Sequence, residues 1–158
     1  LADRLKFLNH LDREIKLSYA RARRKGFKYA VRLNGTSDLP FERYKLENGL
    51  NLMDNNPQVQ FIDYTKVTNR LFQKLPKNYS LTYSQAENNL KDVKQVLKTK
   101  YNIATVFRKK LPKKWLGRKV INGDLSDLRH LEDGKKIIVG LIAKGKAIKN
   151  FNGFVQDV

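Results

Sequence analysis

The stretch that decides the fold is Lys28-Tyr-Ala-Val-Arg-Leu-Asn-Gly-Thr-Ser-Asp38, in which a short apolar run ends in a polar turn that contains glycine. Its odd-numbered residues from Tyr29 to Leu33 are apolar, whereas the opposite face carries Arg32 and Asn34. This alternation predicts a buried strand that delivers Arg32 and Asn34 to an edge where a ligand binds. A strand whose second face meets solvent fits the same pattern.

The length of 158 residues suits a single domain, 1–158. We expect an N-terminal helix in 1–26, four strand–helix units in 27–107 and a basic, less regular part in 108–158. The sequence has no cysteine, which removes disulfides, thiolate zinc sites and iron–sulfur clusters. It has no apolar run of membrane-spanning length, and its first residues do not resemble a signal peptide. These features predict a protein of the reducing cytoplasm, without a membrane partner.

Charge dominates the composition, because 33 Lys and Arg stand against 15 Asp and Glu, a formal net charge of +18. A field of this size favours a polyanionic partner, and nucleic acid is the leading candidate. An acidic protein surface comes second. An anionic membrane is disfavoured because no helix pairs a basic face with a large exposed apolar one. A merely basic protein without such a partner fits the composition as well.

Periodicity predicts alternating helices and strands. Expected helices cover 2–25, with Gly26 as the stop, then 41–53, 67–75 and 85–99, the last opened by a capping box at Ser84-Gln-Ala-Glu87. Expected strands cover 59–64, 79–83, 102–107, 119–121 and 136–142, with a final apolar contact at 153–155. Strand–helix alternation with short connections is typical of a parallel sheet. We therefore predict an α/β fold, either an incomplete parallel (βα) barrel or an open parallel sheet with flanking helices.

Three cation clusters are candidate phosphate contacts: the end of the first helix, Arg108-Lys-Lys-Leu-Pro-Lys-Lys-Trp115, and Lys144-Gly-Lys-Ala-Ile-Lys149. Cations at the helix end also complement the helix dipole, and Trp115 either stacks on a base or anchors a solvated loop. The predicted nucleic-acid contacts are Arg21, Arg23, Arg24, Lys25, Lys28, Arg32, Asn34, Tyr64, Lys66, Tyr83, Arg108, Lys109, Lys110, Lys113, Lys114, Trp115, Arg118, Lys144, Lys146 and Lys149.

Enzyme chemistry has weaker support. Asp124, Asp127, His130 and Asp133 recur every third residue, as hard ligands of a divalent metal could, but the leucines between them indicate packing. No phosphate-binding loop and no Ser-His-acid set is evident, so we expect no metal and no cofactor. An alternative is a nuclease or nucleotide-modifying enzyme at the carboxyl ends of the strands, with Arg32, Asn34, Asp38, Asp63, Lys66 and Asp124 lining its mouth. A protein-interaction module that binds no nucleic acid is a third reading.

Four ordered motifs carry a family resemblance: Val31-Arg-Leu-Asn-Gly-Thr-Ser-Asp38, Gln60-Phe-Ile-Asp-Tyr-Thr-Lys66, Gly123-Asp-Leu-Ser-Asp-Leu-Arg129 and Ile138-Val-Gly-Leu-Ile-Ala-Lys-Gly-Lys-Ala147. Together they resemble a family of uncharacterised bacteriophage and prophage proteins, labelled gene-product-eighty-eight-like. Its members look like partial relatives of the radical S-adenosylmethionine barrels, which implies an incomplete barrel. The cysteine-rich segment that usually precedes the first strand in the family has no counterpart here, so the resemblance favours a scaffold reused for binding.

The resemblance and the charge together define the expected function. We expect a phage protein that binds RNA, such as a tRNA-like molecule, or single strands through phosphate contacts. The phage resemblance implies that this cytoplasm is that of a bacterial host. It also suggests a counter-defence role, such as inhibition of a CRISPR effector, and therefore a host nucleoprotein complex as a further partner.

Overall fold

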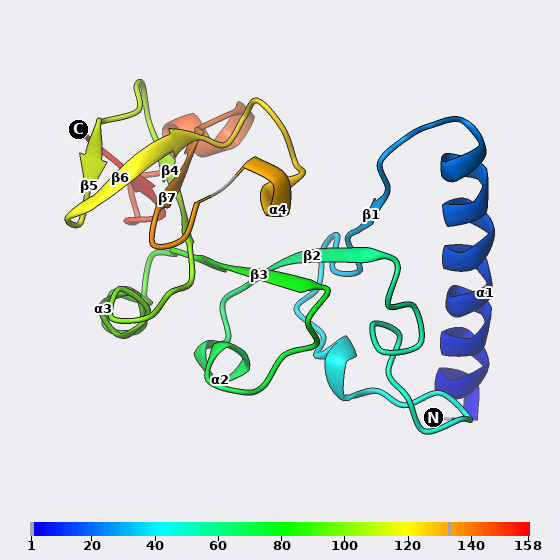
Figure 1. Cartoon of the computed structure of the whole chain (residues 1–158). Helices are drawn as coiled ribbons and strands as arrows, with labels where there is room; N and C mark the ends of the chain where they lie inside the picture. The colour runs from blue at the N-terminus through cyan, green and yellow to red at the C-terminus, as the bar shows by residue number, and fades with distance from the viewer. Residues whose placement is uncertain (1, 133) are drawn as a thin grey trace. The chain divides into compact units, whose positions relative to one another are not determined.

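The computed structural model describes residues 2–132 and 134–158, and its elements are labelled in Figure 1. The chain forms two compact units. Unit 1 comprises the chain up to Asp63 together with Lys74–Ser80, and unit 2 comprises Tyr64–Gln73 and Leu81–Val158. The single domain expected from the sequence stays a prediction, and each unit is described here by itself.

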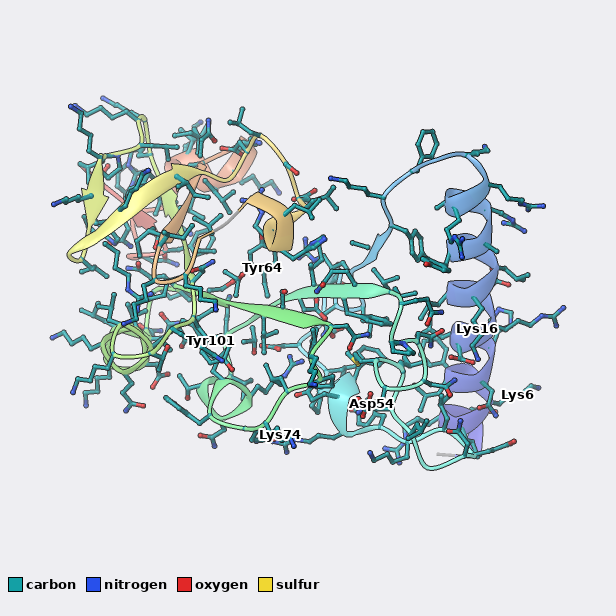
Figure 2. The ribbon with its side chains drawn as sticks, in the orientation of Figure 1. Lys6, Lys16, Asp54, Tyr64, Lys74 and Tyr101 are labelled. Atoms are coloured by element: carbon teal, nitrogen blue, oxygen red, sulfur yellow. The ribbon has the colours of Figure 1, made fainter. Side chains whose placement is uncertain are left out.

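Unit 1 begins with the long helix α1 (Ala2–Arg24). The helix buries Leu8 and Ile15, while Lys6 and Lys16 project from it (Figure 2). It ends as predicted at Gly26, which has a φ of 71°. There, the Gly26 amide donates to the Arg23 carbonyl at 3.0 Å and the Phe27 amide to the Ala22 carbonyl at 2.9 Å. This pair of bonds is the Schellman arrangement, which requires a left-handed residue and therefore favours glycine.

Two parallel strands follow in unit 1. β1 (Ala30–Val31) pairs with β2 (Gln60–Thr65). The Phe61 amide donates to the Asn78 carbonyl at 2.8 Å, which joins β2 to the start of β3 (Tyr79–Ser84). β1 is shorter than the apolar alternation predicts. The chain leaves the ladder after Val31 because local hydrogen bonds around Asn34 turn it toward Leu39.

The helix predicted over 41–53 is wrong. The structure has a 3-10 helix, η1 (Phe41–Arg43), followed by turns. Asn51 donates to the Glu42 carbonyl at 3.1 Å and accepts the Asp54 amide at 2.8 Å, while Gly49 has a φ of 78°. Side-chain bonds of this kind compete with the helical ladder. The predicted core positions Phe41, Leu46 and Met53 are nevertheless buried, whereas Leu50 is exposed.

Unit 2 is organised around β4 (Ile103–Phe107), which pairs in parallel with β3, β7 (Ile138–Ile142) and β8 (Val155–Gln156). β6 (Arg118–Asn122) runs parallel to β7, and the two-residue β5 (Lys114–Trp115) pairs with β6 in antiparallel fashion. The strand order is β1-β2-β3-β4-β7-β6-β5, with β8 beside β4. The predicted fold class is confirmed as an open, mostly parallel α/β sheet. The predicted strands over 59–64, 79–83, 102–107, 119–121 and 136–142 are also confirmed, with each end within two residues of the prediction.

The helices of unit 2 are short: α2 (Thr68–Leu71), α3 (Leu90–Val96), α4 (Arg129–Glu132) and η2 (Gly145–Lys149). The helix predicted over 85–99 is shortened to α3, and the capping box predicted at Ser84 is wrong. Ser84 belongs to β3, and Asn89 closes a turn by accepting the Ala86 amide at 2.7 Å and donating to the Ser84 carbonyl at 2.8 Å. The predicted helix over 67–75 shrinks to α2, with Phe72 exposed. Among the described residues, no helix combines the length and apolar character needed to cross a membrane.

Candidate nucleic-acid interface

The candidate interface is the basic segment, residues 108–119, which runs from the end of β4 through β5 to the start of β6. It contains seven cations and no acidic residue. Three apolar anchors fix it to unit 2: Phe107 is fully buried, Trp115 meets Phe107 edge-on with ring centroids 5.4 Å apart, and Leu111 lies over Gly140 of β7. The segment is therefore a loop with a defined path.

A polar contact holds Trp115 as well. Its Nε1 donates to Gln85 Oε1 at 3.3 Å, and the buried Thr105 hydroxyl donates to the same oxygen at 2.9 Å. The ring is half-buried between these partners. Base stacking and anchoring of the loop were the two roles considered for Trp115. The structure directly supports the anchoring role.

The β5–β6 hairpin turns at Leu116 and Gly117, whose φ angles are 48° and 79°. Two successive left-handed residues are typical of the tight turn that matches the twist of an antiparallel pair. The register places Lys114 opposite Lys119 and Trp115 opposite Arg118. Like charges placed directly opposite each other are destabilising, and a bound anion would relieve this repulsion.

The two arginines of the basic segment are used internally. Arg118 is 8% exposed, and its guanidinium donates to four carbonyls after α3 and at its end: Tyr101 (2.6 Å), Val96 (3.2 Å), Leu97 (2.7 Å) and Thr99 (2.9 Å). Burial lowers the pKa of Arg118. Tyr101 is labelled in Figure 2, next to α3. The prediction that Arg118 contacts phosphate is corrected, because its donors are used by carbonyls at the end of α3 and in the turn that follows it.

Arg108 is occupied in the same way by the C-terminal segment. Its Nε donates to Asp157 Oδ1 at 2.6 Å, its Nη2 to the Asn150 carbonyl at 2.9 Å, and its Nη1 to the Ile148 carbonyl. The hydrogen bond from Arg108 lowers the pKa of Asp157. Arg108 is therefore a positioning residue whose donors are used inside unit 2, and its phosphate contact stays a prediction.

The lysines of the basic segment have the opposite character. All five are exposed, and none forms an ion pair within the described part of the chain: Lys109, Lys110, Lys113, Lys114 and Lys119. Figure 2 shows nitrogen-tipped side chains projecting outward in the region of β5 and β6. Lys119 was absent from the predicted contacts. The structure adds it to the candidate interface because it lies opposite Lys114 in the β5–β6 hairpin.

The lysines of the third predicted cluster, residues 144–149, have different surroundings. Lys144 pairs with Asp124 at 2.7 Å, and this hydrogen bond is the main cause of the lowered pKa of Asp124, which also accepts the Ile142 amide at 2.8 Å. Lys146 and Lys149 are exposed on η2. Lys144 is therefore neutralised locally, while Lys146 and Lys149 are available to a ligand.

The remaining predicted cations lie mostly in unit 1. Arg21, Arg23 and Arg24 form the last turn of α1, followed by Lys25 and Lys28, and all five are exposed without a described ion pair. Arg32 is exposed, and its Nε donates to the Asn34 carbonyl at 3.3 Å. Lys66 is exposed in unit 2. The predicted contacts are thus divided between the two units.

Asn34 and Asp63 form a buried polar network in unit 1, and each is 2% exposed. Asp63 accepts the Asn34 amide at 3.1 Å, Asn34 Nδ2 at 2.9 Å and the Tyr79 hydroxyl at 3.1 Å. Asn34 Oδ1 in turn accepts the Leu39 amide and the Ser37 hydroxyl, each at 2.8 Å. The prediction of a nucleic-acid contact at Asn34 is corrected, because both ends of its amide are bonded inside the protein.

The residues of the alternative enzyme site are not brought together within one unit. Arg32, Asn34, Asp38 and Asp63 belong to unit 1, while Lys66 and Asp124 belong to unit 2. Over residues 2–132 and 134–158, no group of three His, Asp or Glu side chains is arranged to hold a metal ion. Asp133, one member of the predicted acidic series, lies outside the described residues.

The predicted stacking residues are covered by protein. Tyr83 is 0% exposed, which corrects its predicted contact with a base, and Tyr64 is half-buried. The aromatic side chain with the largest exposed fraction in the described chain is Phe151, at 78%. The sequence did not indicate a role for Phe151, because its surroundings depend on the long-range contact with Arg108.

Comparison with known proteins identifies a family for the chain. No curated protein and no solved structure matched the chain. The family model described as Gene product 88 matches residues 1–157. The resemblance of that family to radical S-adenosylmethionine barrels stays a prediction. Since the match spans nearly the whole chain and agrees with the four motifs that carry the resemblance, the protein belongs to the Gene product 88 family.

Proposed function

We propose that this protein binds single-stranded nucleic acid, RNA in the first place, through phosphate contacts made by the basic segment. The observation that carries the proposal is the set of five exposed lysines without an ion-pair partner in the described chain, held on a loop whose arginines and aromatic anchors face inward. Lysine heads that remain in water are suited to contact phosphate oxygens.

The distribution of charge supports the same ligand. Unit 2 carries 19 Lys and Arg against 7 Asp and Glu, a net of +12 out of the +18 of the chain. Inside the basic segment, Lys114 faces Lys119 and no acid is available in sequence to neutralise them. A polyanion that releases its counterions on binding is the partner that such a surface attracts.

The test compares two triple variants with equal loss of charge in the same unit. One is Lys109→Gln with Lys110→Gln and Lys113→Gln. The matched control is Lys91→Gln with Lys94→Gln and Lys98→Gln, exposed lysines on and just after α3. Binding of a fluorescent single-stranded RNA of about 20 nucleotides is followed by anisotropy from about 50 to 200 mM salt.

We expect the wild type to show a steep fall of affinity with salt. Three lost phosphate contacts reduce the slope of log K against log salt by about 2, since each contact on a single strand contributes about 0.7. The α3 variant should keep the wild-type slope. Equal slopes for all three proteins, or no binding at the lowest salt, would contradict the proposal.

A further inference from the structure

Phe151 is an exposed aromatic ring held in place by a cation. It is 78% exposed, and the guanidinium carbon of Arg108 lies 4.1 Å from its ring centroid. This distance is typical of a guanidinium stacked over an aromatic face. One face of the ring is thus occupied by Arg108, and the high exposed fraction leaves the rest of the ring in solvent.

The guanidinium that lies over this ring is itself held by hydrogen bonds. The guanidinium is bonded to Asp157 through two oxygens, at 2.6 and 3.2 Å, and to the carbonyls of Ile148 and Asn150. These contacts use the donors of Arg108 inside unit 2, so the arginine serves to hold Phe151 in place. A large apolar ring that is presented to water is suited to a planar partner.

The charges around the ring decide which planar partner fits. Lys109 follows Arg108 directly, and Lys149 lies between Ile148 and Asn150, whose carbonyls accept bonds from Arg108. Both lysines are exposed and form no ion pair among the described residues, although the charge of Lys109 contributes to the lowered pKa of Asp157. A ligand that carries planar apolar groups and repeated negative charge matches both features. Unpaired bases on a phosphate backbone have this combination, whereas the bases of a duplex are already stacked on each other.

We infer that Phe151, backed by Arg108, is a stacking platform for an unpaired base of a nucleic-acid strand whose phosphates contact Lys109 and Lys149. This inference rests on the proposed function and deepens it, because it requires single-stranded over duplex ligand and assigns the base contact to a residue outside the basic segment. The stacking is tolerant of sequence, since every base has an aromatic face.

The experiment separates stacking from phosphate binding. The full chain is titrated with two single-stranded DNA oligomers of equal length, one of thymidines and one of abasic tetrahydrofuran units, so that the number of phosphates is the same. Wild type is compared with Phe151→Ala, with Phe151→Tyr, which keeps a ring, and with Phe72→Ala. Phe72 is the matched control because it is exposed, at 55%, in the same unit.

We expect the wild type to bind the thymidine oligomer about tenfold more tightly than the abasic one, the scale of a stacked base. Phe151→Ala should remove this difference and leave abasic binding and its salt slope unchanged. Phe151→Tyr and Phe72→Ala should both retain the difference. Circular dichroism confirms that each variant is folded, as expected for exposed positions.

Three outcomes would overturn the inference. If the wild type binds both oligomers equally, stacking at Phe151 is rejected while the proposed phosphate binding stands. If Phe151→Ala weakens both oligomers by the same factor, Phe151 acts on the phosphate surface and does not stack. If neither oligomer nor RNA binds, the proposed function and the inference fail together.

Discussion

At the scale of single residues, arginine and lysine take different places within the basic segment. Arg108 and Arg118 direct planar guanidinium groups at backbone carbonyls inside unit 2, whereas the lysines remain in water. This follows from their chemistry, because a guanidinium presents several donors in a fixed fork and is less strongly hydrated than an ammonium. The sequence could not separate the two sets, since the carbonyls that Arg118 meets lie 17–22 residues away along the chain.

Arg118 gives a test of this division. We expect Arg118→Gln to lower the free energy of unfolding by about 2–4 kcal/mol, because it removes the charged donor that the carbonyls of Leu97, Thr99 and Tyr101 share. Arg118→Lys should recover little, since one ammonium group cannot reach the four carbonyls that the fork reaches. Urea denaturation followed by circular dichroism measures the change. The neighbouring exposed Lys119→Gln is the control and should stay within about 0.5 kcal/mol of the wild type. An Arg118→Gln variant as stable as that control would show that these contacts contribute nothing.

At the scale of elements, strands were predictable and helices were less so. The strands of the parallel sheet are short apolar runs. Such runs indicate buried strands even when the tertiary contacts are unknown. The helix predicted over 41–53 is absent and the one predicted over 85–99 is shortened to α3. In both segments asparagine side chains offer the backbone other partners, as Asn51 and Asn89 do. In the helix predicted over 85–99, the apolar face was nevertheless correct at its centre, since Val93 is fully buried.

The strand β7 carries a second prediction. A Cβ at Gly140 would lie 2.7 Å from Val120 Cγ1 and 2.8 Å from Leu111 Cδ2, closer than these atoms can approach. We therefore expect Gly140→Ala to reduce the free energy of unfolding by about 1–3 kcal/mol through overpacking. The change should also weaken RNA binding, because Leu111 anchors the basic segment.

Gly35 supplies the control for that measurement. A Cβ there meets no atom within 4 Å and its φ is not in the left-handed region, so Gly35→Ala should be neutral. Thermal melts of the two variants give the comparison. A Gly140→Ala variant that melts with the wild type would mean that Leu111 and Val120 move aside without cost.

At the scale of the whole molecule, charge was the part of the candidate site that composition predicted best. The excess of lysine and arginine and the position of the basic segment could be read from the sequence. The exposure of Phe151 and the internal use of Arg108 could not, because both depend on the contact between residues 108 and 148–157. Local patterns locate cations, and tertiary contacts decide which of them reach solvent.

The net charge of +18 leads to a prediction about stability. Like charges on a compact chain repel each other, and salt screens that repulsion. We expect the Tm to rise by several degrees when sodium chloride is increased from about 10 to about 200 mM, where the Debye length falls below about 10 Å. Melts by circular dichroism, on protein freed of nucleic acid, measure the shift. An equal osmolality of sucrose controls for excluded-solute effects, and a Tm that falls with salt would show that attractive ion pairs outweigh the repulsion.

The chain passes from one unit to the other three times, after Asp63, after Gln73 and after Ser80. No single proteolytic cut can therefore release either unit whole: a fragment ending at Asp63 lacks residues 74–80 of unit 1, and a fragment beginning at Leu81 lacks residues 64–73 of unit 2. β3 illustrates this, since Tyr79 bonds to Asp63 in unit 1 and Tyr83 lies in the core of unit 2 four residues later. Truncated versions should consequently be insoluble or protease-sensitive.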